Sequence, residues 1–277
     1  MVQNVRLTLI VGLLILFLLC FYVLGKLSIV YFIFWAVFFM LIAEVMLSCA
    51  AGRQRLERKM RRELNLEKGS STTARVKLPE DEQTFYWRTA IRLYDLSLPF
   101  YLMCLVMFYI PGMHKDVACT LRLLSCTSLA SSTGTTREQC LEQRNSCPET
   151  QIGEILPETG GRWPIFVTAM WMPLLVVCFE LAANRMVVKW QHVSYQFIMW
   201  FSYWFATMIG EVLIGYPVFP TSFDWQCANN AIVPGNDCWT NLISTMLLML
   251  ALQCTFFALL YFAHDYRNRK IKEKMGN

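Results

Sequence analysis

Three acidic side chains interrupt long apolar segments of the sequence, where a charge is expensive to bury. They are Glu44, Glu180 and Glu211, and Asp95 lies at the edge of another apolar segment. Ionisable residues within membrane-spanning segments commonly mark a pathway for ions or protons. The alternative is structural, since buried acids also pair with cations on neighbouring helices. These four residues therefore predict either a cation or proton site, or a set of ion pairs.

Other reaction centres are not apparent in the sequence. It contains no zinc-ligand spacing, no glycine-rich nucleotide loop and no nucleophile elbow. The histidines His114, His192 and His264 are far apart, and the pair His264–Asp265 is interpreted as an interfacial position. We therefore expect no catalytic residues, no metal and no cofactor, and a protein that is not an enzyme.

The acids lie within a sequence that is typical of a membrane protein. It is 56% hydrophobic and 16% charged, outside the range of ordinary soluble domains. Six apolar segments are long enough to cross a bilayer as helices. They are residues 7–24, 28–50, 96–113, 164–183, 194–217 and 241–263. The predicted fold is all-α, a polytopic bundle of six transmembrane helices. A cleaved signal peptide is the alternative for the first segment, which is longer than a typical signal sequence.

Lysine and arginine predict the orientation of this bundle. They are frequent in residues 51–95 and 264–277, whereas residues 218–240 contain none. Short loops rich in these cations stay cytoplasmic, so we expect both termini in the cytoplasm. The predicted order begins with a transmembrane hairpin at 1–50, a cytoplasmic basic and interfacial segment at 51–95 and the third span at 96–113. An extracytoplasmic cysteine-rich loop follows at 114–163, and then spans four and five at 164–217. A second extracytoplasmic loop at 218–240, the sixth span at 241–263 and a basic cytoplasmic tail at 264–277 complete the order. A multi-pass protein of the plasma membrane or the secretory pathway is expected.

A basic amphipathic helix is predicted after the second span. Its cations are Arg53, Arg55, Arg58, Lys59, Arg61 and Arg62. Such a segment is attracted to anionic lipids of the inner leaflet by about 1 kcal/mol for each cation near the surface. An ordinary topogenic signal is the simpler interpretation.

Cysteines supply a second indication of orientation. Two C-x₆-C patterns, Cys119/Cys126 and Cys140/Cys147, flank a turn predicted at residues 131–134. Two short antiparallel helices stapled by disulfides Cys119–Cys147 and Cys126–Cys140 would satisfy this spacing, although four cysteines permit three connectivities. In the second loop we expect a disulfide between Cys227 and Cys238. Disulfides belong to the oxidising side of a membrane.

Helix direction then gives the depth of the acids. Glu44 lies about 9 Å from the inner end of its span, and Glu180 and Asp95 have similar depths, so the three side chains could converge. Glu211 belongs to the outer half.

Cations are available near these acids. Arg88, Arg92 and Arg185 lie at the right depth for the inner group, and Lys26 could reach Glu211. Because cations nearly match anions in number, we favour structural pairing over transport.

The sequence therefore predicts an integral membrane interaction or accessory protein, a scaffold or a subunit of a membrane complex. Its expected partners are anionic membrane lipids and other membrane proteins, and no nucleic acid is expected. Two alternatives remain open. One is a small cation or proton channel or transporter that uses the intramembrane carboxylates, and the other is a lipid-modifying membrane enzyme.

Overall fold

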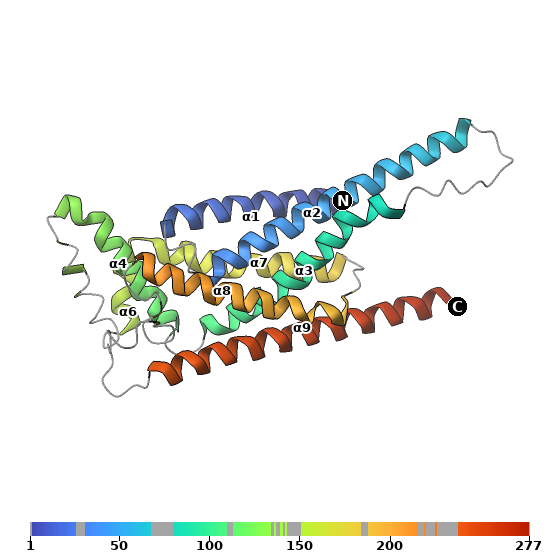
Figure 1. Ribbon diagram of the computed structural model, residues 1–277. Helices are drawn as coiled ribbons and strands as arrows, with labels where there is room; N and C mark the ends of the chain where they lie inside the picture. Colours follow the sequence, from blue (N-terminus) through green and yellow to red (C-terminus); the bar gives the residue numbers. More distant parts are fainter. Residues whose placement is uncertain are drawn as a thin grey trace.

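Long helices that lie alongside one another make up the chain in the computed structural model (Figure 1). The structure describes residues 2–25, 31–67, 80–109, 113–133, 136, 139–140, 142, 151–183, 188–214, 219, 225 and 238–276. The helices are α1 (Val2–Leu24), α2 (Phe32–Glu67), α3 (Glu80–Phe108), α4 (Met113–Thr133), α6 (Ile152–Ile155), α7 (Arg162–Ala183), α8 (Val193–Ile214) and α9 (Cys238–Gly276), with 3-10 turns η2 (Leu156–Thr159) and η3 (Trp190–His192). In the described part of the chain the fold is all-helical and contains no strand, as predicted.

Among the described residues, five helices are long and apolar enough to cross a membrane. The segments are Gln3–Leu24, Ile33–Gly52, Arg88–Phe108, Arg162–Leu181 and Trp239–Lys270. The predicted fifth span, 194–217, corresponds to α8, which is a 22-residue helix but is not among the five. Five spans are thus compatible with a multi-pass membrane protein.

The third span lies earlier in the chain than the sequence suggests. It was expected at 96–113, but the apolar segment of α3 is Arg88–Phe108. Pro111 and Gly112 follow, which explains why the helix ends before them, and Met113 already begins α4. The polar residues before 96 continue the same helix.

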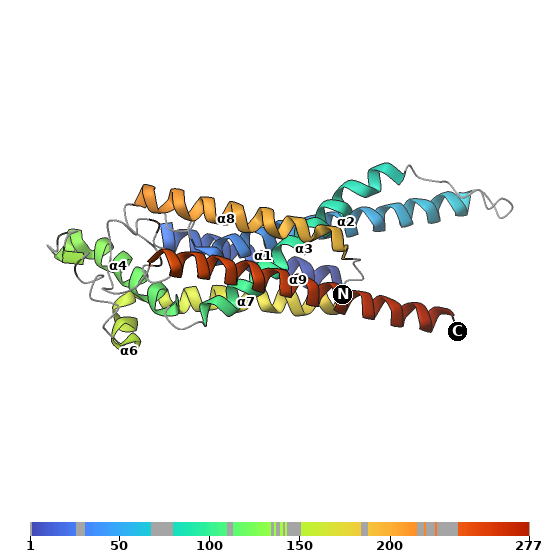
Figure 2. The same cartoon turned by 60° about the horizontal axis from the view of Figure 1, so that its bottom comes forward.

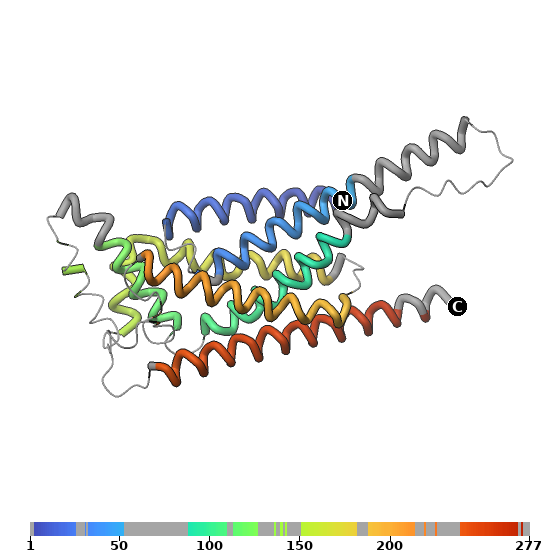
Figure 3. The backbone as a smooth tube through the Cα atoms, viewed as in Figure 1, coloured from blue at the N-terminus to red at the C-terminus, as the bar shows by residue number. Residues whose placement is uncertain are grey.

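Both termini lie toward one end of the bundle, and α4 and α6 lie at the other. Figures 1 and 2 show this from two directions. We call the first the terminal end and the second the cap end. In Figure 3, α9 follows the whole length of the bundle from the cap end to the terminal end. The segments with disulfide-forming cysteines and the basic tail are therefore separated by the length of the bundle.

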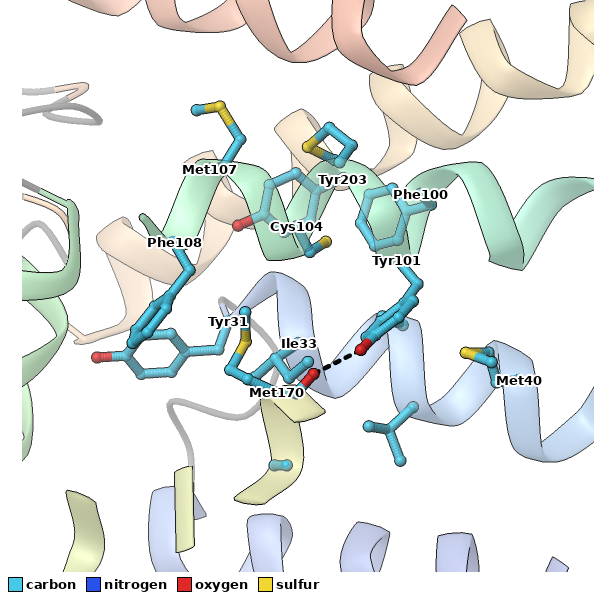
Figure 4. Close-up of a cluster of buried hydrophobic side chains, with 14 of the residues drawn as sticks. Tyr31, Ile33, Met40, Phe100, Tyr101, Cys104, Met107, Phe108, Met170 and Tyr203 are labelled. Carbon is cyan, nitrogen blue, oxygen red and sulfur yellow. Dashed lines mark hydrogen bonds between the residues drawn. The ribbon is translucent and has the colours of Figure 1, made fainter. Parts of the chain in front are cut away.

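Aromatic side chains fill the centre of the bundle between α2, α3, α7 and α8. Tyr31, Phe100, Tyr101 and Tyr203 are fully buried (Figure 4). The Tyr101 hydroxyl donates a hydrogen bond to the Met170 carbonyl over 2.6 Å. This carbonyl lies in α7 in the turn before Pro173, whose missing N–H would otherwise bond to the carbonyl of Ala169, the residue before Met170. Lipid tails are as apolar as these side chains, so close packing stabilises the bundle here.

The outer faces of the helices are apolar as well. On α1, more than 40% of the surface of each of the following side chains is exposed: Leu7, Val11, Leu14, Ile15, Leu18, Leu19, Phe21 and Tyr22. Exposed apolar residues also cover α8 and α9. A continuous apolar surface of this kind fits helices that are surrounded by lipid.

Candidate functional site

Three buried charged residues from three helices meet near the terminal end. Arg6 on α1, Glu44 on α2 and Glu180 on α7 are 4%, 2% and 0% exposed. The Arg6 guanidinium donates from Nε and Nη2 to Glu180 Oε1 over 3.1 and 2.9 Å, and from Nη2 to Oε2 over 3.1 Å. The same Nε lies 3.4 Å from Glu44 Oε2. The structure thus brings Glu44 and Glu180 together, with Arg6 between them.

Arg6 was not identified as a partner from the sequence. We expected Arg88, Arg92 or Arg185 to neutralise the inner acids, but Arg88 and Arg92 are exposed, and Arg185 lies outside the described residues. A depth estimate for the first span would have found Arg6, because it lies close to the expected inner end of α1. A neighbouring contact also joins α1 and α2, since the Gln3 amide donates to the Ser48 hydroxyl over 3.0 Å.

Asp95 belongs to a different polar cluster. Its carboxylate Oδ2 lies 2.5 Å from His192 Nδ1, and its backbone carbonyl accepts a 2.5 Å hydrogen bond from the Gln196 amide. Gln253 on α9 donates to the Gln196 side-chain oxygen over 2.8 Å. The cluster therefore joins α3, α8 and α9. Asp95 has the expected depth, but it lies on another side of α3 from the one that would meet Glu44.

His192 lies just before α8 and is the titratable partner in this cluster. Burial lowers the pKa of His192 below its ordinary value of 6.5, and the positive charges of Lys189 and Arg92 lower the pKa further. At neutral pH the ring is therefore uncharged, and its Nδ1 shares a short hydrogen bond with the Asp95 carboxyl group. This hydrogen bond satisfies one oxygen of a buried acid.

Glu211 lies toward the cap end and binds the loop that follows α8. Its Oε2 accepts a 3.0 Å hydrogen bond from the backbone N–H of Trp225. The Trp225 indole in turn donates to the Thr207 hydroxyl over 3.2 Å. Lys26, the expected partner of Glu211, lies outside the described residues. The carboxylate thus fixes a loop segment on the bundle.

A small cavity lies beside the Arg6 cluster. Its volume is about 10 Å³, measured as space open to the centre of a water molecule, which is room for about one water. Glu44, Glu180, Tyr94 and Ser97 contribute polar groups to its lining. Within the described part of the chain, Glu44 Oε2 and the Tyr94 hydroxyl have no hydrogen-bond partner.

The cap consists of α4, α6 and η2. Cys126 on α4 forms a disulfide with Cys140, and their Cα atoms are 5.8 Å apart. Arg122 forms an ion pair with Glu158, and Arg162 donates to the Ser125 hydroxyl over 2.7 Å. These contacts attach α4 to η2 and to the start of α7.

The cap differs from the predicted pair of short helices. Helix α4 continues to Thr133, so the turn expected at residues 131–134 cannot begin before Gly134. Cys119 is buried in the cap, but its predicted partner Cys147 lies outside the described residues. The predicted disulfide Cys227–Cys238 also lies outside the described residues, because neither Cys227 nor the side chain of Cys238 is described. These two pairings stay predictions.

The predicted lipid-contacting cations lie on the continuation of α2 at the terminal end. The backbone there is helical to Glu67, and the side chains of Arg53, Arg55, Arg58, Lys59, Arg61 and Arg62 lie outside the described ones. Among the side chains that the structure describes, no three His, Cys, Asp or Glu residues are grouped closely enough to hold a metal ion. Comparison with protein-family models, with curated proteins and with solved structures finds no match to this chain.

Proposed function

We propose that the chain is an integral membrane accessory protein that binds another membrane protein through its cap. In this proposal it crosses the membrane six times, because α8 also crosses it, in addition to the five helices named above. Both termini are cytoplasmic and the cap faces the outside or the lumen. At 22 residues α8 is about 33 Å long, enough to span a bilayer, and it packs against α3 and α9.

The pairing of the buried acids carries this proposal. Glu180 is held by three hydrogen bonds from Arg6, Asp95 by His192, and Glu211 by the Trp225 backbone. A transport site needs carboxylates that can exchange partners with a passing ion. Here each carboxylate joins two segments of the fold, which favours a structural role.

The cap supplies a surface suited to a partner. Cys126–Cys140 and the Arg122–Glu158 pair hold its backbone in place, so little ordering is needed on binding. The acidic side chains Glu142 and Glu154 are exposed there. A partner with basic residues on its outer surface would complement them.

The test compares one charge reversal at each end of the protein. Glu154→Lys changes the cap, and Glu273→Lys makes the same change in the exposed tail of α9. The full-length protein is purified from its native membrane in mild detergent, and stoichiometric partners are identified. We expect Glu154→Lys to lower the recovery of the partner at least about tenfold, the equivalent of 1.4 kcal/mol, and Glu273→Lys to leave it unchanged.

Two results would contradict the proposal. One is that the protein is purified from its native membrane without a stoichiometric partner. The other is equal recovery of the partner with both variants. Orientation is tested at the same positions, since an impermeant thiol reagent should label E154C but not E273C on intact cells.

A cation or proton transporter is the second candidate. It is favoured by the cavity beside Glu44, where a carboxylate oxygen has no hydrogen-bond partner among the described residues.

A further inference from the structure

The Arg6 cluster combines two acidic groups with one guanidinium. Glu44 and Glu180 are both almost fully buried, and Arg6 contacts both. If both acids were ionised, these three groups would together carry one negative charge inside the bundle. Such a charge is costly away from water unless a proton or a cation neutralises it.

The closeness of the two acids indicates a proton. Glu180 Oε1 lies 3.1 Å and Glu44 Oε2 lies 3.4 Å from the same atom, Arg6 Nε. Two ionised carboxylates that share one cation in this way repel each other, and one proton on either of them removes the repulsion.

The hydrogen bonds of Arg6 decide which acid carries the proton. Glu180 accepts three hydrogen bonds from the guanidinium, which stabilise its ionised form. Glu44 Oε2 lies 3.4 Å from Arg6 Nε, farther than either oxygen of Glu180 lies from the guanidinium, and it accepts no hydrogen bond from the described residues. The proton therefore belongs on Glu44.

The cavity beside Glu44 provides the second part of the site. It has room for about one water, and the Tyr94 hydroxyl lines it without a partner in the described chain. Tyr94 is 4% exposed and lies on α3, whereas the three charged residues lie on α1, α2 and α7. A water here would accept from Tyr94 and donate to Glu44 Oε2, which satisfies both groups.

We propose that Glu44, Glu180 and Tyr94 form a buried binding site for one proton and one water molecule. The proton comes from solvent and resides on Glu44, and no other bond is made or broken. Arg6 on α1 holds Glu180 ionised. Among the residues that the structure describes, other charged or titratable groups near the site are Asp95 on α3, and His264 and Arg267 on α9. Arg267 is itself directed to the Leu181 carbonyl and His264.

Infrared spectroscopy of the full-length protein in lipid nanodiscs tests the location of the proton. A protonated carboxyl has a carbonyl stretching band that an ionised one lacks. At neutral pH we expect one such band, which shifts in deuterated water, disappears in Glu44→Gln and persists in the matched control Glu154→Gln. Tyr94→Phe should shift the band, because the hydroxyl that donates a hydrogen bond to the water is then absent.

Glutamine substitution gives an independent test through stability. Glutamine resembles a protonated glutamate, so Glu44→Gln should leave the unfolding midpoint at neutral pH within about 2 °C of the original protein. Glu180→Gln removes the charge that Arg6 needs and should lower the midpoint by roughly 5–10 °C. If Glu180→Gln does not fold, the infrared comparison of Glu44→Gln and Glu154→Gln still decides.

Three outcomes would overturn the proposal. The first is the absence of a protonated carboxyl band at neutral pH. The second is a band that survives in Glu44→Gln. The third is an unfolding midpoint that sodium raises and a bulky organic cation does not, in the original protein but not in Glu44→Gln. That result would replace the proton with a metal cation.

Discussion

Replacing Arg6 by methionine removes the cation from the buried cluster and keeps an unbranched apolar side chain in place of the arginine stem. Glu180 then loses three hydrogen bonds, and Glu44 loses its cation at 3.4 Å. Removing one partner of a buried pair typically costs 3–5 kcal/mol, since the remaining charge stays buried. We expect Arg6→Met to lower the free energy of unfolding by about 3–5 kcal/mol.

The assay is reversible unfolding of the purified protein in mixed micelles, followed by circular dichroism. The control is Arg269→Met, which breaks the pair with Asp265 on the exposed part of α9, where the two side chains are 74% and 37% exposed. Exposed pairs contribute about 0–1 kcal/mol, so this variant should change stability by less than that.

A double-mutant cycle separates pairing from packing. If Arg6 acts through Glu180, the variant Arg6→Met/Glu180→Gln should lose about 2–3 kcal/mol less than the sum of the two single variants. Equal losses for Arg6→Met and Arg269→Met would refute the reasoning. Additive losses in the cycle would refute it as well.

Three further predictions concern other parts of the fold. Replacing Cys126 by serine should destabilise the cap by about 3 kcal/mol, because the disulfide no longer lowers the entropy of the unfolded chain by closing a loop of about 15 residues. Non-reducing peptide mapping should find Cys126 joined to Cys140, and a bridge to another cysteine would contradict this. The unfolded chain binds a proton at His192 more readily than the folded protein, whose pKa is lowered. Unfolding midpoints should therefore fall as pH drops below about 6.5 and depend less on pH in His192→Gln; an unchanged pH profile would argue against it. Gly160 and Gly161 both have positive φ, 60° and 77°, but only at Gly160 would a Cβ lie 2.9 Å from another side chain. Gly160→Ala should cost about 1 kcal/mol more than Gly161→Ala in thermal unfolding, and equal costs would contradict the close approach of Ser125 to this turn.

The acids show how far depth estimates from a sequence can reach. Glu44 and Glu180 were expected at one depth because the direction of each helix follows from the charges of its flanking loops, and the structure brings them into one cluster. Asp95 has the same depth but contacts His192. Depth gives the position along the bundle axis, whereas the rotation of each helix about its own axis depends on packing against its neighbours.

Loops explain the remaining differences. The spacing of Cys126 and Cys140 was sufficient to suggest their disulfide, since both lie on helical segments. By contrast, the contact of Glu211 with the Trp225 backbone depends on how a long loop folds back, and no local pattern predicts this. Arg6 was overlooked because a cation near the N-terminus is common in topogenic signals.

Ion flux in sealed vesicles tests the central claim, that the buried acids hold the bundle together instead of conducting. Purified protein is reconstituted, and the fluxes of protons and sodium are compared with those of protein-free vesicles and of Glu211→Gln and Glu44→Gln vesicles. The account predicts that the original protein leaves both fluxes at the protein-free level. A flux well above that level that is lost in a correctly folded Glu211→Gln or Glu44→Gln protein would contradict it.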